Sequence, residues 1–457
     1  MTQSVLATDL YQLTMMAGYQ HAGIGGRSTF ELYVRHLPEG RGFLVVAGIE
    51  QALDLLAGLR FTADEIQYLR TVPALASAPE AFFADLLPSF RFNGDVWAVD
   101  EGEVVFPHEP ILRVTAPGAE AQLVETALLA TITFQTSIAS KAARIVHAAQ
   151  GSLASGDATR ARQVIEFGSR RAHGLDAALF AARAAYVAGC AATSNVEAGY
   201  RFGIPVSGTM AHSWVMSFAR EIDAFREYLG LFGAGTTLLI DTYDTIAATH
   251  AIVSAGLRPG GVRLDSGDLV ALSTDVRRVL DAGGLTDTKI IVSGDLDEYR
   301  IARLLANGAP IDAFGVGTAL STSKDAPALG GVYKLVEIER DAVMAPVLKL
   351  SAGKRTLPGS KQVWRLSDNG RASGDVLALA AEPSPGGRPL LRLMMQRGHR
   401  LHQPGKIEAS RRHAGDAMGE LPDGVRRLTG WDAYPVGISA ALEDLAARTA
   451  ERLVRRN

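Results

Sequence analysis

The sequence predicts an α/β protein in which an irregular (β/α) barrel is joined to a β-rich α+β domain built from both ends of the chain. Short β-branched runs alternate with helix-like segments through the middle of the chain, a pattern typical of consecutive βα units. Strand-like segments separated by glycine and proline turns occur before and after that middle. The expected domains are 1–118, 119–335 and 336–457, and we expect the last to pack with the first.

The N-terminal part is expected to be rich in strands. Apolar and polar side chains alternate over residues 30–35, which predicts a half-buried strand. Residues 43–59 are typical of an apolar strand that turns into a helix, and residues 91–115 of short strands between turns.

The barrel is predicted from a regular spacing. After an alanine-rich, helix-prone stretch that starts near residue 120, seven short apolar runs follow, each ending in small or polar residues. The steps from Asp241 to Asp265, Gly294 and Gly317 are 24, 29 and 23 residues, about one strand, one helix and two loops each. Seven such units favour a closed barrel over an open sheet, with its chemistry at the carboxyl ends of the strands. The runs are 163–171, 193–196, 204–212, 237–244, 261–269, 289–297 and 312–318.

The C-terminal segment returns to strand-like sequence. Its strand-like pieces are VYKLVEI, PVLKLS and KQVWRL, and it ends in a charged helix over residues 441–456.

Composition narrows the function classes. The chain has 457 residues, 47% of them hydrophobic, and its 46 Lys and Arg nearly balance 49 Asp and Glu. Nucleic acid and anionic membranes are therefore not expected as partners. We expect small-molecule partners instead. A single cysteine, Cys190, allows no intrachain disulfide, which favours the reducing cytoplasm. No secretion signal or membrane span is expected, because the N-terminus has no basic start followed by an apolar run and no window of 18 apolar residues occurs.

Three small-residue turns predict a phosphate site. The sequence SGDL occurs at Ser266–Leu269 and again at Ser293–Leu296, each time directly after an apolar run, and FGVGT follows at 314–318. Backbone N–H groups at such strand ends suit a phosphate. Turn formation alone also explains each glycine, but three turns on neighbouring strand ends favour phosphate binding.

Carboxylates surround these turns. Asp241, Asp244, Asp265, Asp268 and Asp295 would repel a phosphate unless a divalent cation lay between them, and oxygen ligands beside phosphate favour Mg²⁺. The alternative is helix capping, for which Asp268 and Asp295 are well placed.

Cations and a histidine occur at the same strand ends. Arg170 and Arg171 follow FGS, Arg263 lies inside GVRLDSG, and His212 closes SGTMAH beside Thr209. Arginine pairs with phosphate or carboxylate, and histidine suits acid–base work or phosphoryl transfer. The alternatives are surface charge for Arg170 and Arg171, a buried ion pair for Arg263 and a structural role for His212.

Several motifs are absent from the sequence. It has no GxxxxGK[ST], GxGxxG before a helix, HExxH or GxSxG, so P-loop kinases, Rossmann dehydrogenases and α/β-hydrolases are disfavoured. The residues alone favour a magnesium-dependent barrel enzyme acting on a phosphorylated substrate. A Schiff-base aldolase would need a lysine at a strand end, and these strand ends have none.

Ten segments, in order from residue 8 to residue 365, resemble nicotinate phosphoribosyltransferase. They are TDLYQ at 8–12, ELYVRHLPEGRGFLVVAGIEQAL at 31–53, EFGSRRAHG at 166–174, TSNVEAG at 193–199, GTMAHS at 208–213, VRLDSGDL at 262–269, SGDLDE at 293–298, GVGTALST at 315–322, GGVYKLV at 330–336 and KLSAGKRTLPGSKQVWR at 349–365.

The resemblance implies a reaction of NAD salvage. Nicotinate and phosphoribosyl pyrophosphate would give nicotinate mononucleotide and pyrophosphate, with Mg²⁺ as cofactor and coupled hydrolysis of ATP as co-substrate. It also implies the type II phosphoribosyltransferase barrel and a homodimer with shared active sites.

The resemblance further implies roles for individual residues. His212 would be the histidine that ATP phosphorylates, and Tyr11 would stack on the pyridine ring. Thr209, Arg263 and Phe167 would bind nicotinate, the first two at its carboxylate. Asp265 would lie near the ribose hydroxyls or bind Mg²⁺. The residues expected to bind phosphoribosyl pyrophosphate are Ser169, Arg171, Asp265, Ser293, Gly294, Gly317 and Thr318.

Three rival functions fit the sequence less well. A nicotinamide-specific enzyme would favour an acidic side chain near the ring substituent, whereas the GTMAH turn supplies no carboxylate. A quinolinate enzyme would need more cations and no ATP-linked histidine. A non-catalytic phosphosugar sensor would show erosion of His212, Arg263 or the SGDL turns, and none is eroded.

Overall fold

The computed structural model describes residues 4–151, 162–351, 356–403 and 405–455. The chain forms two compact units, residues 1–137 with 328–457 and residues 138–327. The first boundary lies inside helix α6 (Glu125–Gln150), and not at the change of texture near residue 118.

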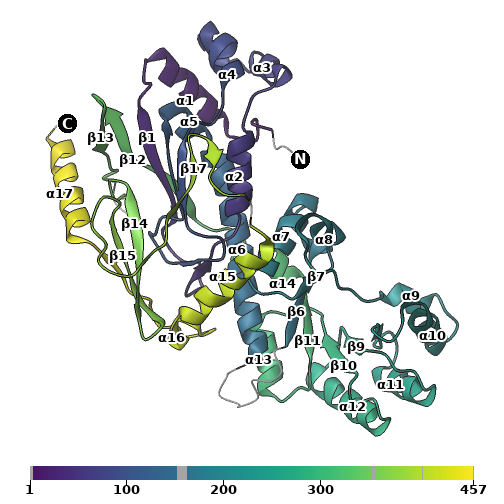
Figure 1. Cartoon of the computed structure of the whole chain (residues 1–457). Helices are drawn as coiled ribbons and strands as arrows, with labels where there is room; N and C mark the ends of the chain where they lie inside the picture. Colours follow the sequence, from purple (N-terminus) through teal and green to yellow (C-terminus); the bar gives the residue numbers. More distant parts are fainter. Residues whose placement is uncertain (1–3, 152–161, 352–355, 404, 456–457) are drawn as a thin grey trace. The chain divides into compact units, whose positions relative to one another are not determined.

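A seven-stranded sheet of the first unit combines both ends of the chain (Figure 1). The N-terminal strand β1 pairs antiparallel with β12 on one side and with β5 on the other. This pairing confirms the expectation of a β-rich part made from both chain ends. In spatial order the strands are β13 (Val343–Pro346), β12 (Gly331–Arg340), β1 (Arg27–Val34), β5 (Leu112–Pro117), β3 (Asp95–Ala98), β17 (Arg392–Gln396) and β18 (His399–Arg400).

Strand β1 is buried on both faces, so the prediction of a half-buried strand is wrong. Phe30 stacks on Tyr333 of β12 with ring centroids 4.8 Å apart. On the other face the carboxylate of Glu31 is buried with Lys361, Nζ to Oε2 2.8 Å. The alternation in the sequence therefore separates an apolar core face from a face with a buried ion pair, and not core from solvent.

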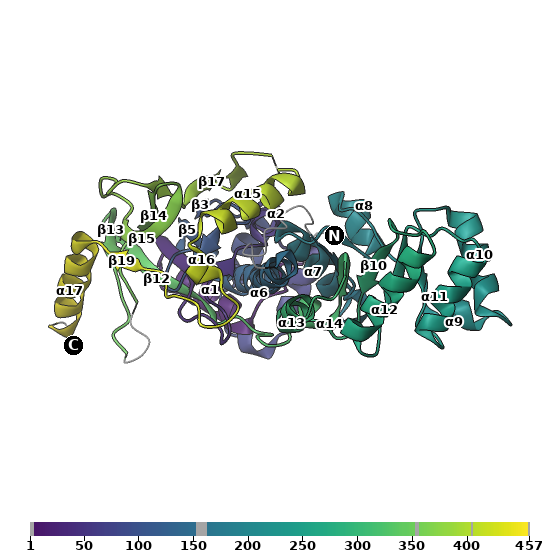
Figure 2. The ribbon, with the colours of Figure 1, turned by 90° about the horizontal axis from the view of Figure 1, so that it is seen from below.

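A second, four-stranded sheet of the first unit is made by the C-terminal segment, and α17 packs against β15 in it (Figure 2). A short pair, β2 (Leu44–Val45) with β4 (Val104–Val105), lies next to helix α15. The four strands in order are β16 (Arg388–Pro389), β14 (Lys361–Asp368), β15 (Arg371–Leu379) and β19 (Val436–Ile438).

The helices of the first unit share its apolar core with the strands of the seven-stranded sheet. Strand β2 leads into α2, as the sequence predicts, and the alanine-rich stretch forms α5 and α6. The remaining bounds are α1 (Leu10–His21), α2 (Ile49–Gly58), α3 (Ala63–Leu69), η1 (Pro73–Leu75), η2 (Phe82–Leu86), α4 (Leu87–Ser89), α5 (Gly118–Leu123), α15 (Ile407–Glu420), α16 (Asp423–Arg426) and α17 (Ala440–Val454).

The second unit is built on a curled sheet of six parallel strands, which confirms the α/β class. Of the six strands in this sheet, the one that comes last in the chain, β11, pairs with the one that comes first, β6, as a barrel requires. Among the described residues no pairing joins β7 to β8, so the expected closed barrel is corrected to one that is open there. Between these strands Val206 makes only an isolated bridge, to Thr193. The order is β7 (Ala192–Thr193), β6 (Gln163–Glu166), β11 (Ala313–Val316), β10 (Lys289–Val292), β9 (Gly261–Leu264) and β8 (Thr237–Leu239).

Helices follow the strands of this sheet, and three of those described, α11, α12 and α13, are capped by aspartates. Asp244 and Asp268 accept backbone N–H groups at the starts of α11 and α12, the capping role foreseen for Asp268. Asp295 has no such role, because Asp297 caps α13 instead. The bounds are η4 (Ser169–Arg171), α7 (Leu175–Val187), α8 (Val196–Phe202), α9 (His212–Met216), α10 (Glu221–Phe232), α11 (Thr245–Ser254), α12 (Leu269–Ala282), α13 (Glu298–Ala306) and α14 (Thr318–Ser321).

No helix in the described part of the chain is long and apolar enough to cross a membrane.

Candidate active site

The carboxyl ends of the parallel strands gather most of the predicted site residues. Phe167 and Ser169 follow β6, Asp265 follows β9, Ser293 follows β10 and Gly317 follows β11. Parallel strands bring these ends to one edge of a sheet, where α/β proteins place their chemistry.

Arg263 is the centre of the polar contacts at this edge. Its Nε donates to Ser293 Oγ at 2.7 Å, its Nη1 to Thr209 Oγ1 at 2.8 Å and its Nη2 to Asp265 Oδ1 at 2.7 Å. The side chain is 12% exposed. Three of the five guanidinium N–H groups are thus engaged, which leaves two for a ligand.

Asp265 balances the charge of Arg263. Burial alone would raise the pKa of Asp265, but hydrogen bonds from Ser293 and Arg263 and the positive charge of Arg263 outweigh burial and leave the pKa below its ordinary value. The carboxylate is therefore ionised at neutral pH, and its Oδ1 is occupied by the two donors.

Ser293 serves the same ion pair. Its backbone N–H donates to Leu264 O at 2.9 Å, and its hydroxyl donates to Asp265 Oδ1 at 2.5 Å while accepting from Arg263. Both of its donors are engaged within the protein. The contacts of Ser293 thus orient Arg263 and Asp265.

An aromatic ring lies under the guanidinium. The Arg263 carbon Cζ is 5.6 Å from the centroid of the Phe167 ring, within range of a cation–π contact. A Cβ on Gly315 would approach this ring to 2.5 Å, so the ring needs a glycine there. Phe167 and Arg263 together offer a flat apolar surface beside a cation.

His212 lies at the start of α9 and contacts a buried carboxylate. Its Nε2 is 3.3 Å from Asp241 Oδ1, and the histidine is 41% exposed whereas the aspartate is 3% exposed. The second oxygen of Asp241 accepts from the backbone N–H of Asp265 at 2.8 Å and from Ser266 Oγ at 2.9 Å. Asp241 thus joins His212 to the turn after β9.

Glu221 adds a titrating group to this region. Burial, and then the negative charges of Asp241 and Asp244, raise its pKa to about 7. Glu221 is not among the residues predicted from the sequence, because nothing in its local sequence indicates that α10 brings it near Asp241.

Gly294 is fixed by close approach. Its φ is +90°, and a Cβ there would come within 2.0 Å of the carbonyl oxygen of Asp265. The second SGDL turn can therefore lie against the first only with glycine at this position.

The remaining predicted phosphate ligands belong to two turns. Ser169 and Arg171 form η4, where the Arg171 side chain is exposed and Ser169 Oγ is buried without a partner among the described residues. Gly317 and Thr318 begin α14. An unpartnered buried hydroxyl beside an exposed arginine suits an anionic ligand.

Tyr11 belongs to the first unit. Its hydroxyl donates to Glu125 Oε2 at 2.9 Å, and the side chain is 47% exposed. Partial burial of the phenol, and then the hydrogen bond and charge of Glu125, raise the pKa of Tyr11 to about 12. Its contact with nicotinate stays a prediction.

At this edge Asp265 is the residue whose contacts bear on the predicted metal ion. Within the described ranges no group of three or more His, Cys, Asp or Glu side chains could hold a metal. Asp265 keeps one oxygen outside its contacts with Arg263 and Ser293. Mg²⁺ is usually held by one or two carboxylates together with substrate phosphates.

Two family models match the chain. The nicotinate phosphoribosyltransferase (NAPRTase) N-terminal domain matches residues 6–133, and the NAPRTase family matches residues 162–357.

Relatives and a solved structure cover nearly the whole chain. A nicotinate phosphoribosyltransferase of Mycobacterium tuberculosis is 42% identical over 97% of this chain and 93% of its own length. The nicotinate phosphoribosyltransferase of Bacillus subtilis is 39% identical over 98% of this chain and 95% of its own length. The crystal structure of human nicotinic acid phosphoribosyltransferase has a TM-score of 0.82 at 30% identity, over 96% of this chain and 99% of that chain.

A more distant structure shows the same fold. Nicotinate-nucleotide pyrophosphorylase from Pyrococcus furiosus has a TM-score of 0.72 at 24% identity, over 91% of this chain and 95% of that chain.

Proposed function

This chain belongs to the nicotinate phosphoribosyltransferase family, and we propose that it joins nicotinate to phosphoribosyl pyrophosphate, with coupled ATP hydrolysis. The products are nicotinate mononucleotide and pyrophosphate, a step of NAD biosynthesis. The observation that carries the proposal is Arg263, which lies over Phe167 at the carboxyl edge of the sheet with two N–H groups uncommitted.

Arg263 suits the carboxylate of nicotinate. A guanidinium with a donor left on each terminal nitrogen matches the two oxygens of a carboxylate. Thr209 and Ser293 hold the guanidinium in place, so little side-chain entropy is lost when the ligand binds. Phe167 offers its face to the pyridine ring, and Tyr11 is proposed to stack on it.

The chemistry needs positioning more than proton transfer. The pyridine nitrogen already carries a lone pair, so no general base is required. Departure of pyrophosphate builds positive charge at the anomeric carbon. Mg²⁺ held by Asp265 and the diphosphate would supply the charge that neutralises the leaving group. Ser169, Arg171, Gly294, Gly317 and Thr318 are proposed to hold the phosphates, and Ser293 to fix the turn that precedes Gly294.

His212 is proposed to take the γ-phosphoryl group of ATP. With Nε2–H donating to Asp241, Nδ1 keeps a lone pair that attacks the γ-phosphorus. A P–N bond forms, the bond between phosphorus and the bridging oxygen breaks, and ADP leaves. Asp241 holds the proton on Nε2 and stabilises the cationic ring.

The other partners follow from the family. We propose a homodimer with shared active sites and a cytoplasmic location, which agrees with the single, buried Cys190. The substrates are small molecules, and neither a nucleic acid nor a membrane is proposed as a partner.

The test replaces Arg263. Arg263→Lys keeps the charge but loses the planar fork, so kcat/KM for nicotinate should fall about 100-fold, measured as mononucleotide formation. Arg277→Lys is the matched control, since in the described part of the chain Arg277 hydrogen-bonds to Asp281 and to the backbone carbonyls of Thr288 and Leu285, and not to a proposed site residue. Equal activity of Arg263→Lys and wild type would refute the assignment of Arg263.

The ATP-linked step has its own readout. With γ-labelled ATP, the wild type should acquire an acid-labile phosphoryl group, and His212→Ala should not. Label on both proteins, or on neither, would remove His212 from the mechanism.

A further inference from the structure

We propose that Glu166, a residue without an assigned role, is a positioning residue for phosphoribosyl pyrophosphate, because its buried carboxylate ties together three segments at the phosphate end of the sheet. The inference rests on the proposed function. It concerns how the site is held and not which atoms react.

Glu166 is the last residue of β6 and is 1% exposed. Its Oε1 accepts from the backbone N–H of Gly168 and from Ser321 Oγ at 2.9 Å. Its Oε2 accepts from Thr193 Oγ1 at 2.6 Å. One carboxylate thus holds the turn after β6, the end of β7 and helix α14.

Two of these segments carry the proposed phosphate ligands. The turn after β6 continues from Gly168 into Ser169 and Arg171, and α14 starts at Thr318 directly after Gly317. They pack closely, because a Cβ on Gly168 would lie 1.5 Å from Ser321 Oγ. A shift of the carboxylate would therefore move both sets of ligands together.

The third segment, the end of β7, links Glu166 to helix α8. Thr193 Oγ1, which donates to Glu166, also accepts from the backbone N–H of Asn195. Asn195 in turn caps α8. The hydrogen bonds of Glu166 thus continue into the neighbouring turn.

The hydrogen-bond pattern of Glu166 fits a positioning role. Burial raises the pKa of Glu166, against the three hydrogen bonds from Thr193, Gly168 and Ser321, and no cation contributes to the shift. Only a carboxylate offers acceptors on both oxygens to three donors in this arrangement. Among the described residues no cation pairs with this buried carboxyl group, and burying such a polar group is costly, so packing alone would favour an apolar residue.

The test compares Glu166→Gln with wild type in steady-state kinetics. Glutamine keeps the shape but turns one acceptor into a donor facing Thr193, so the segments should lose their common anchor. KM for phosphoribosyl pyrophosphate should rise about tenfold, while KM for nicotinate should stay within about twofold. Glu103→Gln is the matched control, because Glu103 is equally buried in a charged network of the first unit. It should lower stability without changing either KM.

A second pair of variants keeps the proposal testable if Glu166→Gln misfolds. Thr193→Val and Ser321→Ala each remove one donor, and the double variant should reproduce the rise in KM. Unchanged KM for phosphoribosyl pyrophosphate in a folded Glu166→Gln or in the double variant would overturn the proposal.

Two further readouts separate this inference from the proposed function. Binding of pyrophosphate with Mg²⁺, by calorimetry, should weaken about tenfold in Glu166→Gln, and amide exchange at Gly168 should accelerate. A wild type that makes no mononucleotide would refute the function, while these two measurements would still decide the role of Glu166. Unchanged pyrophosphate affinity and exchange would refute that role even in an active enzyme.

Discussion

Arg263 illustrates how a single residue acquires its role from contacts with segments that lie far apart in the sequence. Its donors reach Thr209, Asp265 and Ser293, which lie 54, 2 and 30 positions away in the chain. The sequence indicated that each of these residues sits at a strand end. The sequence could not indicate that the backbone N–H and the hydroxyl of Ser293 donate to Leu264 and Asp265, because these hydrogen bonds depend on atoms that only the fold brings together.

At Gly294 we predict a large effect from a single methyl group. Gly294→Ala has to adopt φ +90° and to displace the Asp265 carbonyl oxygen, 2.0 Å from the new Cβ. We expect a loss of about 2 kcal/mol in the free energy of unfolding and about 100-fold in kcat/KM, since Asp265 and Arg263 would move. Urea unfolding and steady-state kinetics measure the two.

The matched control is Gly284→Ala. Gly284 has φ +72°, but a Cβ added there would have no atom within 4 Å, so only backbone strain of about 1 kcal/mol is expected. Activity should be unchanged. If both variants keep full activity, the close contact between the two SGDL turns does not matter for catalysis.

Among the secondary-structure elements, the aspartates after the strands show what sequence can and cannot assign. Asp268 caps α12 as foreseen, but Asp297 and not Asp295 caps α13. Helix α12 begins at the leucine of its SGDL turn, whereas α13 begins only after Asp297, and Asp295 has φ +47°, in the left-handed region. Both aspartates suit an N-cap by residue type, so only the backbone path distinguishes them.

A buried ionic network that joins strands β4, β14 and β15 to α15 predicts a pH dependence. The hydrogen bond from His413 to Glu103 raises the pKa of His413, against the effect of burial. The pair's contribution to stability is therefore fully present below the ordinary histidine pKa and is lost as the pH rises through the raised value. Glu103 itself, with a pKa of about 2 despite burial, stays ionised throughout.

Urea unfolding between pH 5.5 and 8.5 measures this dependence. The wild type should lose stability with rising pH, and His413→Gln, which cannot titrate, should show a flatter profile. The same slope in both proteins would show that His413 does not couple to folding.

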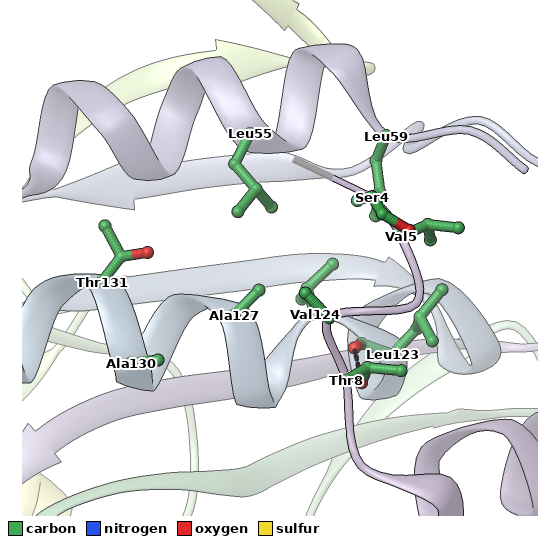
Figure 3. Close-up of a pocket in the computed structure, with 11 residues that line it drawn as sticks. Ser4, Val5, Thr8, Leu55, Leu59, Leu123, Val124, Ala127, Ala130 and Thr131 are labelled. Carbon is green, nitrogen blue, oxygen red and sulfur yellow. Dashed lines mark hydrogen bonds between the residues drawn. The ribbon is translucent and has the colours of Figure 1, made fainter. Parts of the chain in front are cut away.

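A cavity between α2 and α6 predicts a stabilising substitution. It has a volume of about 110 Å³, and Leu55 and Ala127 point into it from the two helices (Figure 3). Ala127→Leu adds apolar atoms that fill the space and keeps a good helix former. We expect the free energy of unfolding to rise by about 1 kcal/mol, measured by urea unfolding. A fall in stability would mean that the cavity walls cannot accept the side chain.

For the whole molecule, local sequence patterns predicted the helices and strands, whereas pairing between distant segments determined how the sheets are assembled. The recurrence of strand and helix predicted the parallel sheet, and the texture of the chain ends predicted the β-rich part. The opening of the barrel between β7 and β8 was not predictable from the sequence. It depends on whether residues 204–212 pair as a strand, and among the described residues of that run only Val206 forms a bridge. The role of Glu166 could not be predicted for the same reason. Of the three groups that donate to it, those of Thr193 and Ser321 are distant in the sequence and that of Gly168 lies in a turn.

The most direct test of the central claim is a competition assay with the purified wild type. Equal concentrations of nicotinate and nicotinamide are incubated with phosphoribosyl pyrophosphate, Mg²⁺ and ATP, and the mononucleotides are identified by mass. The account predicts nicotinate mononucleotide almost alone, because Arg263 pairs with a carboxylate and not with a neutral amide. Nicotinamide mononucleotide in equal amount, or no mononucleotide at all, would contradict it.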